Sequence, residues 1–73
     1  MNKQVCASRL SEVRHMFGLS QVKFGKLVNL PQTTISRLEL AHCCPSASTM
    51  HKLALAIDVS PSFIMGESEQ MFL

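Results

Sequence analysis

The hydrophobic positions near the start of the chain repeat with the spacing of a helix. They follow one another at intervals of four, three and four residues, and they are Cys6, Leu10, Val13 and Phe17. Because a helix turns by about 100° per residue, these side chains share one stripe and predict a helix over about residues 4–17. Gly18 comes next, and a glycine just past the last helical residue is a common stop signal.

Two short helices joined by a tight turn are predicted next. Ser20 can cap a helix that runs to about residue 28, because its side chain accepts backbone N–H bonds. The apolar contacts expected of this helix are Phe24, Leu27 and Val28. Asn29 tolerates the left-handed conformation that a sharp turn requires, and Pro31 suits the first turn of a third helix. Gly25 costs about 1 kcal/mol against alanine inside a helix, which indicates a closely packed neighbour.

The third predicted helix has an apolar edge and a polar edge. Its inward residues are Ile35 and Leu38, together with Leu30 from the turn. Rotation by 100° per residue directs outward the side chains of Thr33, Ser36, Arg37 and Leu40, and it leaves Gln32 at the flank of the first turn. Such an edge is suited to contact base edges, although an ordinary solvated face is the simpler alternative.

The remainder of the chain predicts two more helices. Ser46 can cap a fourth helix, whose inward residues are Met50, Leu53, Ala54 and Ile57. Ser60 and Pro61 can open a short fifth helix that runs through Met65 and ends at Gly66. No segment shows the alternation of a strand, and no internal repeat is found.

The length and composition indicate a single compact domain. Seventy-three residues suffice for one core, and a hydrophobic content of 47% excludes general disorder. With the helical pattern, this predicts an all-α domain of five helices over residues 1–66 and a short acidic and apolar tail over residues 67–73.

The sequence also limits the cellular setting. No apolar run approaches the roughly 18 residues that cross a bilayer, and the N-terminus lacks the apolar stretch of a signal peptide. Three cysteines, an odd number, do not suggest a disulfide framework. We therefore expect a cytoplasmic protein with reduced thiols and no membrane partner.

Charge is unevenly distributed along the chain. The net charge is only +2, but residues 1–57 hold all seven Lys and Arg with two glutamates, which gives +5. Residues 58–73 hold three acidic residues and no basic one, which gives −3. The first part of the chain is therefore suited to a polyanion such as DNA.

Four short motifs occur at a characteristic spacing. They are Leu19-Ser20-Gln21, the run Thr34-Ile35-Ser36-Arg37 with Glu39, Pro45-Ser46, and Val59-Ser60. Each motif is weak by itself, but their joint spacing is specific. Over about residues 6–65, and without a gap, the chain resembles the lambda-repressor-like family, also called the Cro or Xre type of helix-turn-helix protein.

The resemblance implies a lambda-repressor-like fold that binds double-stranded DNA through its second and third helices. The family positions that read bases in the major groove correspond to Gln32, Thr33, Ser36 and Arg37. The positions that bind phosphates correspond to Gln21 and Thr34, and a helix N-terminus such as that at Gln21 favours anions. Arg14 and Glu39 match positions that form a structural ion pair between the first helix and the end of the third.

The chemistry of these side chains suggests the bases that they prefer. A glutamine such as Gln32 can bond adenine N6 and N7, and an arginine such as Arg37 can bond guanine O6 and N7. The methyl group of Thr33 can meet the thymine methyl group. Each good pair is worth roughly 1–3 kcal/mol against the wrong base.

The C-terminal region carries more apolar side chains than one short helix can bury. They are Phe63, Ile64, Met65, Met71, Phe72 and Leu73. We expect Ile64 to join the core. Because members of the resembled family commonly dimerise in this region, Phe63, Ile64 and Met65 are predicted to contribute to a homodimer through residues 61–66. The alternative is a disordered tail whose last three residues are exposed.

Three hypotheses for function follow. The first is a sequence-specific transcriptional regulator that binds a palindromic operator as a dimer, with a repressor of the phage, restriction–modification controller or antitoxin type as the expected setting. The second is a protein–protein interaction module with weak or lost DNA binding, motivated by the base-poor loop at residues 40–45 and by an outward Leu40. The third is a thiol-sensing regulator that uses Cys43 and Cys44.

Catalytic, metal and cofactor sites are not predicted. His42, Cys43 and Cys44 lack the paired spacing of a structural zinc site, and neither Cys6 nor His51 is brought to them by any motif. No Ser/His/Asp arrangement or carboxylate pair has a spacing that argues for catalysis. An enzyme is therefore the least supported class.

Overall fold

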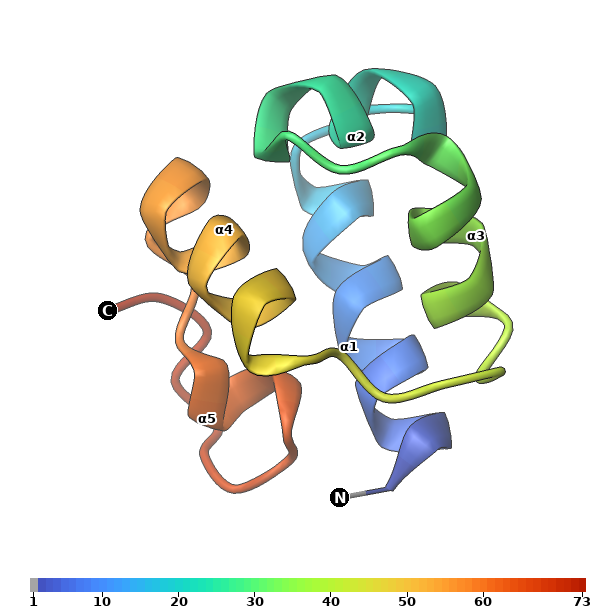
Figure 1. Ribbon diagram of the computed structural model, residues 1–73. Coiled ribbons are helices and arrows are strands. Elements are labelled where there is room, and N and C mark those ends of the chain that lie inside the picture. Colours follow the sequence, from blue (N-terminus) through green and yellow to red (C-terminus); the bar gives the residue numbers. More distant parts are fainter. Residues whose placement is uncertain (1) are drawn as a thin grey trace.

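The computed structural model describes residues 2–73, which form five helices (Figure 1). They are α1 (Lys3–Met16), α2 (Gln21–Val28), α3 (Gln32–Glu39), α4 (Ala47–Ile57) and α5 (Pro61–Ile64). Among these residues there is no strand, and an isolated antiparallel bridge joins Val59 to Phe72. The predicted all-α fold of five helices is confirmed. The predicted domain of residues 1–66 begins at Met1, which lies outside the described residues.

Most helix ends form at the residues that the sequence indicates. Ser20 and Ser46 each accept an N–H bond from the residue three positions on, at 3.2 Å. The left-handed backbone expected at the predicted turns and stops is present at Gly18, Asn29 and Gly66. One cap is not predicted: the Asn2 side chain accepts two N–H bonds from the first turn of α1. The local signals therefore account for most of the boundaries.

The start of α3 differs from the prediction. The sequence places Pro31 in the first turn, whereas α3 begins at Gln32 and Pro31 occupies the N-cap position with φ −61° and ψ 148°. Proline has no side-chain oxygen, so α3 has no side-chain cap. The Pro31 carbonyl instead accepts the N–H groups of Thr34 and Ile35 at 3.0 and 3.2 Å.

The core is built around α1, which lies in the middle of the molecule (Figure 1). Helix α2 crosses one end of α1, α3 lies on one side of it, and α4 and α5 lie on the other. Every helix contributes at least one fully buried side chain, namely Leu10, Val13, Phe24, Ile35, Leu53 and Ile64. No helix within residues 2–73 has the length and hydropathy of a membrane span.

Four of the predicted inward positions are less buried than the periodicity suggests. Leu27 and Phe17 are exposed, and Ala54 and Ile57 are only partly buried. The sequence predicts Leu27 as one of the apolar contacts of α2. The prediction for Leu27 is wrong because no further element covers that flank, where Leu27 and Leu55 line a shallow surface hollow.

Gly25 lies where α2 meets the turn into α3. A Cβ atom on this residue would lie 2.5 Å from the backbone oxygen of Leu30 and 3.7 Å from the Ile35 side chain. The Leu30 N–H also donates to the Gly25 carbonyl at 2.8 Å. The turn therefore folds directly onto the glycine, which explains why a residue with poor helix propensity is found in α2.

The C-terminal segment packs back onto the domain. Backbone bonds of 2.8 Å join the Ser60 N–H to the Met71 carbonyl and the Leu73 N–H to the Asp58 carbonyl. The ring of Phe72 lies edge-on to the ring of Phe17, the residue after α1. Met71 and Phe72 also pack against the core. The alternative of a disordered tail with three exposed residues is therefore wrong for Met71 and Phe72, while Leu73 is exposed.

Replacing Gly25 by alanine tests the close contact at the turn. Helix propensity alone would make Gly25→Ala stabilising by about 1 kcal/mol. Because the new methyl group would lie 2.5 Å from the Leu30 carbonyl oxygen, we expect instead a loss of about 1–3 kcal/mol in the free energy of unfolding, measured by urea denaturation.

Gly18→Ala is the matched control. Gly18 has φ +67° but nothing within 4 Å of an added Cβ, so it should lose only the left-handed backbone strain of about 1–2 kcal/mol. A gain in stability for Gly25→Ala would contradict the steric explanation.

Candidate nucleic-acid interface

An ion pair ties α1 to the end of α3. Arg14 Nε donates to Glu39 Oε2 at 2.7 Å, and Arg14 Nη2 donates to Glu39 Oε1 at 2.9 Å. The two side chains are only 13% and 8% exposed. The hydrogen bond to Glu39 raises the pKa of Arg14, although burial acts in the opposite direction. The pair predicted from the family resemblance therefore lies together, with the two-pronged geometry that makes Arg–carboxylate pairs strong.

Arg14 also fixes the turn that leads into α2. Its Nη1 atom donates to the Leu19 carbonyl oxygen at 2.9 Å. One guanidinium thus joins α1, the turn between α1 and α2, and the last residue of α3. The angle between α2 and α3 is consequently held by a charged group as well as by apolar packing.

Two glutamines link the first residues of α2 and α3. Gln32 Nε2 donates to Gln21 Oε1 at 2.9 Å, and Gln21 Nε2 donates to Glu39 Oε1 at 3.2 Å. Both residues are the first of their helices. The sequence predicts a separate role for each, with Gln32 as a base reader and Gln21 as a phosphate ligand. Their spacing of eleven residues gives no local sign of the contact, which depends on the angle between the two helices.

The polar edge of α3 is open to solvent. Gln32, Thr33 and Arg37 are exposed, and Thr34 and Ser36 are partly buried. The opposite edge is buried through Ile35 and Leu38. All five polar residues predicted on α3 therefore lie on the accessible side of a helix that forms one flank of the molecule (Figure 1).

Comparison with known proteins agrees with this geometry. A family model described as a helix-turn-helix matches residues 10–64, which is more than half of the chain. The chain belongs to the Cro/C1-type helix-turn-helix family. The resemblance inferred from its motifs is thereby confirmed, and α2 and α3 are the two helices of the motif.

Relatives of this helix-turn-helix chain are found among curated proteins. The HTH-type transcriptional regulator PuuR of Escherichia coli (strain K12) is 37% identical over 62 residues, which make up 85% of this chain and 34% of the relative. The regulator of the same name in Shigella flexneri gives the same values. The chain thus spans about a third of the length of the curated relatives it matches. No solved structure matches it.

The predicted dimerisation residues are for the most part used inside the domain. Phe63 is 3% exposed and Ile64 is fully buried. The guanidinium of Arg9 covers the Phe63 ring, 4.2 Å from its centroid, and also donates to the Ser68 carbonyl oxygen at 3.3 Å. The expectation that Phe63 and Ile64 present an interface is therefore corrected, because both side chains are buried within the domain and Arg9 of α1 covers the Phe63 ring.

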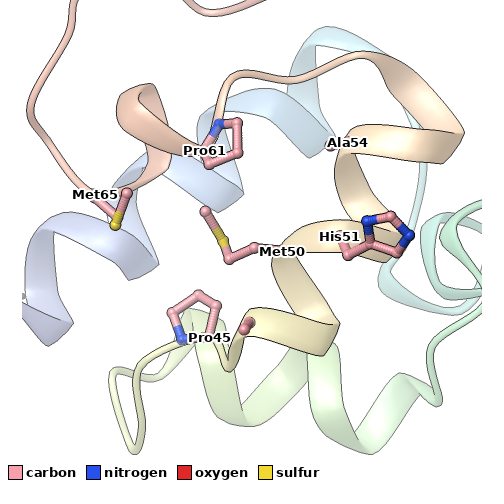
Figure 2. Close-up of a pocket in the computed structure, with 7 residues that line it drawn as sticks. Pro45, Met50, His51, Ala54, Pro61 and Met65 are labelled. Atoms are coloured by element: carbon pink, nitrogen blue, oxygen red, sulfur yellow. The ribbon is translucent and has the colours of Figure 1, made fainter.

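Met65 belongs to an apolar hollow between α4 and α5 (Figure 2). The hollow has a volume of about 470 Å³ and opens to solvent. It is lined by Pro45, Ala47, Met50, His51, Ala54, Pro61 and Met65. Of the three residues predicted to mediate dimerisation, Met65 alone lies partly exposed at this surface.

The cysteines lie at or near the core, although Cys43 and Cys44 belong to the loop between α3 and α4. Cys6 is buried, and Cys43 and Cys44 are partly buried thiols. Burial raises the pKa of the Cys6 thiol, and the neighbouring Cys44 raises it further. In the part of the chain that the structure describes, no three His, Cys, Asp or Glu residues gather in a way that could hold a metal ion.

Breaking the buried ion pair should destabilise the fold. Arg14→Ala leaves the Glu39 carboxylate buried without its cation, and we expect a loss of about 3–5 kcal/mol in the free energy of unfolding. Urea denaturation followed by circular dichroism measures it. Glu69→Gln removes one charge from the Arg9–Glu69 pair, where Glu69 is 92% exposed, and should hardly move the midpoint. A loss for Arg14→Ala as small as that for Glu69→Gln would show that the Arg14–Glu39 pair is not important for stability.

Proposed function

We propose that this protein is a sequence-specific DNA-binding transcriptional regulator. The observation that carries the proposal is the exposed polar edge of α3, whose first residue, Gln32, is held by Gln21 and the Arg14–Glu39 pair. A rigid, solvent-facing helix with hydrogen-bonding side chains is the element that a helix-turn-helix places in the major groove. Family membership supports the same conclusion, as does the similarity to the PuuR transcriptional regulators.

Each residue of the site has a chemical role in the proposal. Gln32 bonds adenine, Arg37 bonds guanine, and Thr33 offers a methyl group to thymine. Ser36 contributes a further hydroxyl beside them. Backbone phosphates are bound by Gln21, at the start of α2, and by Thr34, which is partly buried at the start of α3.

The distribution of charge favours an approach through α3. The acidic C-terminal segment lies across α1 from α3 (Figure 1), and its Glu69 is paired with Arg9 at 3.3 Å. The acidic residues of this segment, Glu67 and Glu69, are thereby kept away from the proposed interface. Arg37 lies exposed on α3 itself, so the potential there is suited to phosphates.

We propose further that the protein binds a near-palindromic operator as a homodimer. Two copies of α3 would then occupy successive major grooves about 34–36 Å apart. The apolar hollow with Met65 is the surface that supports this step, since an exposed apolar hollow on a domain of 73 residues is suited to burial against a second copy. A dimer on promoter DNA would act as a repressor in the cytoplasm by occupying the site.

A second candidate function is a protein-binding module with weak DNA affinity. It is favoured by Leu40, which is 61% exposed at the end of α3. The loop that follows, residues 40–45, contains no lysine or arginine that could grip a phosphate. A gel shift against random-sequence DNA separates the two functions, because only the DNA-binding function gives a salt-sensitive shift.

Selection of bound duplexes from a random pool tests the main proposal. A dimer of this type should enrich a sequence with two-fold symmetry and half-sites separated by one helical turn. Equal affinity for every duplex at physiological salt would overturn it, and an enriched sequence without symmetry would overturn the dimer alone.

Two alanine variants should separate base reading from phosphate binding. Arg37→Ala should cost about 1–3 kcal/mol on the selected site and relax preference at one base pair per half-site. Gln21→Ala should weaken binding to all duplexes, because a phosphate contact carries no sequence information, and it should leave the preference at the Arg37 base pair in place. Binding to a panel of single-base variants of the site measures both.

Lys52→Ala is the control for the loss of a positive charge. Lys52 lies on α4, across the molecule from α3, and its removal should leave the base preferences unchanged. If Arg37→Ala lowered affinity without changing any preference, Arg37 would be a phosphate ligand rather than a base reader.

A further inference from the structure

The hydrogen bonds that reach Gln32 form a series with a fixed direction. Arg14 donates twice to the Glu39 carboxylate, at 2.7 and 2.9 Å. On the other side, Gln32 Nε2 donates to Gln21 Oε1 at 2.9 Å, and Gln21 Nε2 donates to Glu39 Oε1 at 3.2 Å. Every donor in the series therefore points towards Glu39.

This direction follows from the chemistry of Glu39. A carboxylate that pairs with a guanidinium can only accept hydrogen bonds. Gln21 must therefore turn its NH₂ group to Glu39, which leaves its carbonyl oxygen facing Gln32. That oxygen accepts a bond only from a donor, so Gln32 must turn its own NH₂ group to Gln21.

We infer that Glu39 is a positioning residue that sets the base preference of Gln32. The inference rests on the proposed function, because it concerns the base that Gln32 reads. With one N–H used by Gln21, the carbonyl oxygen and the second N–H of Gln32 remain for the groove. The carbonyl oxygen of Gln32 can accept a hydrogen bond from the N6 amino group of adenine, and the second N–H can donate to adenine N7.

The opposite orientation of the Gln32 amide would reject adenine. Its NH₂ group would then meet the N6 amino group of adenine, and its carbonyl oxygen would meet the N7 acceptor. Glu39 excludes this orientation through Gln21, although the Glu39 side chain is only 8% exposed and does not itself bond to Gln32 in the series. A buried carboxylate thus determines which atoms an exposed side chain offers to DNA.

Glu39→Gln reverses the series and tests the inference. Arg14 would hold the carbonyl oxygen of the amide introduced at position 39, and the new NH₂ group would face Gln21. Gln21 and Gln32 would then both turn over. The base pair concerned is found first, as the one whose preference disappears in Gln32→Ala.

The measurement is the ratio of affinities for duplexes with adenine or guanine at that base pair. We expect the unaltered protein to prefer adenine by at least about fivefold, and Glu39→Gln to lower the preference to about twofold or less. The control, Glu69→Gln, makes the same substitution at the exposed ion pair and should keep the preference.

A double variant covers the case in which Glu39→Gln does not fold. Arg14→Met combined with Glu39→Met replaces both partners of the buried pair by apolar side chains, an exchange that proteins often tolerate. Gln21 then has no carboxylate to face, so both orientations of the Gln32 amide become accessible. The adenine preference should fall again, while Gln21 remains available for its phosphate.

The orientation of the amides can also be read without DNA. In the free protein, the NH₂ protons of Gln21 should give nuclear Overhauser contacts to the side chain at position 39. In Glu39→Gln these contacts should move towards Gln32. Circular dichroism confirms that each variant is folded.

The outcomes separate this inference from the proposed function. If the unaltered protein prefers adenine and both the single and the double variant keep that preference, Glu39 does not position Gln32, although the DNA-binding proposal stands. If no duplex is preferred at all, the proposed function fails, and the Overhauser contacts then test only whether Glu39 orients the two amides. Contacts that do not change in Glu39→Gln would overturn it.

Discussion

The guanidinium of Arg14 and the carboxylate of Glu39 hold together parts of the chain that are distant in sequence. Their two short hydrogen bonds join the middle of the molecule to the last residue of α3, and a third bond reaches the turn before α2. Because such a pair is directional, it restrains angles that apolar contacts alone leave adjustable. The helix-turn-helix can therefore present its exposed edge as a rigid surface. The same pair positions Gln21, which donates to Glu39, and through Gln21 it positions Gln32.

The fold was predictable from short-range signals where neighbouring residues alone determine the backbone conformation. Caps such as Ser20 and Ser46, and left-handed turns such as Asn29, depend on a few neighbouring residues and form as expected. Periodicity was less informative about what covers a face. Leu27 has helical spacing with the core residues but is 45% exposed beside a surface hollow. Phe63 is covered by Arg9 of α1, which also donates to Ser68 of the C-terminal segment. Both outcomes depend on contacts between distant residues, which spacing does not encode.

The residues of the candidate site came from motif spacing and family resemblance, and the structure adds the relations between them. Gln21 and Gln32 each have a role that the motif indicates. That they bond to one another, and that Glu39 accepts from Gln21, depends on the angle between α2 and α3. Pro31 shows the same limit, because it can stand in either the first turn or the cap position, and the structure places it at the cap. The sequence therefore identifies the residues of the site, whereas the contacts between those residues are seen only in the structure.

The return of the C-terminal segment has a practical consequence for handling the protein. The bond from the Leu73 N–H to the Asp58 carbonyl fixes the last residue beside the end of α4, on the flank opposite α3 (Figure 1). A flexible glycine–serine linker attached after Leu73 would leave that bond in place, since a peptide extension removes no donor. Immobilisation through such a linker attaches the molecule on the flank opposite α3 and leaves α3 accessible, which suits surface-based measurements of duplex binding.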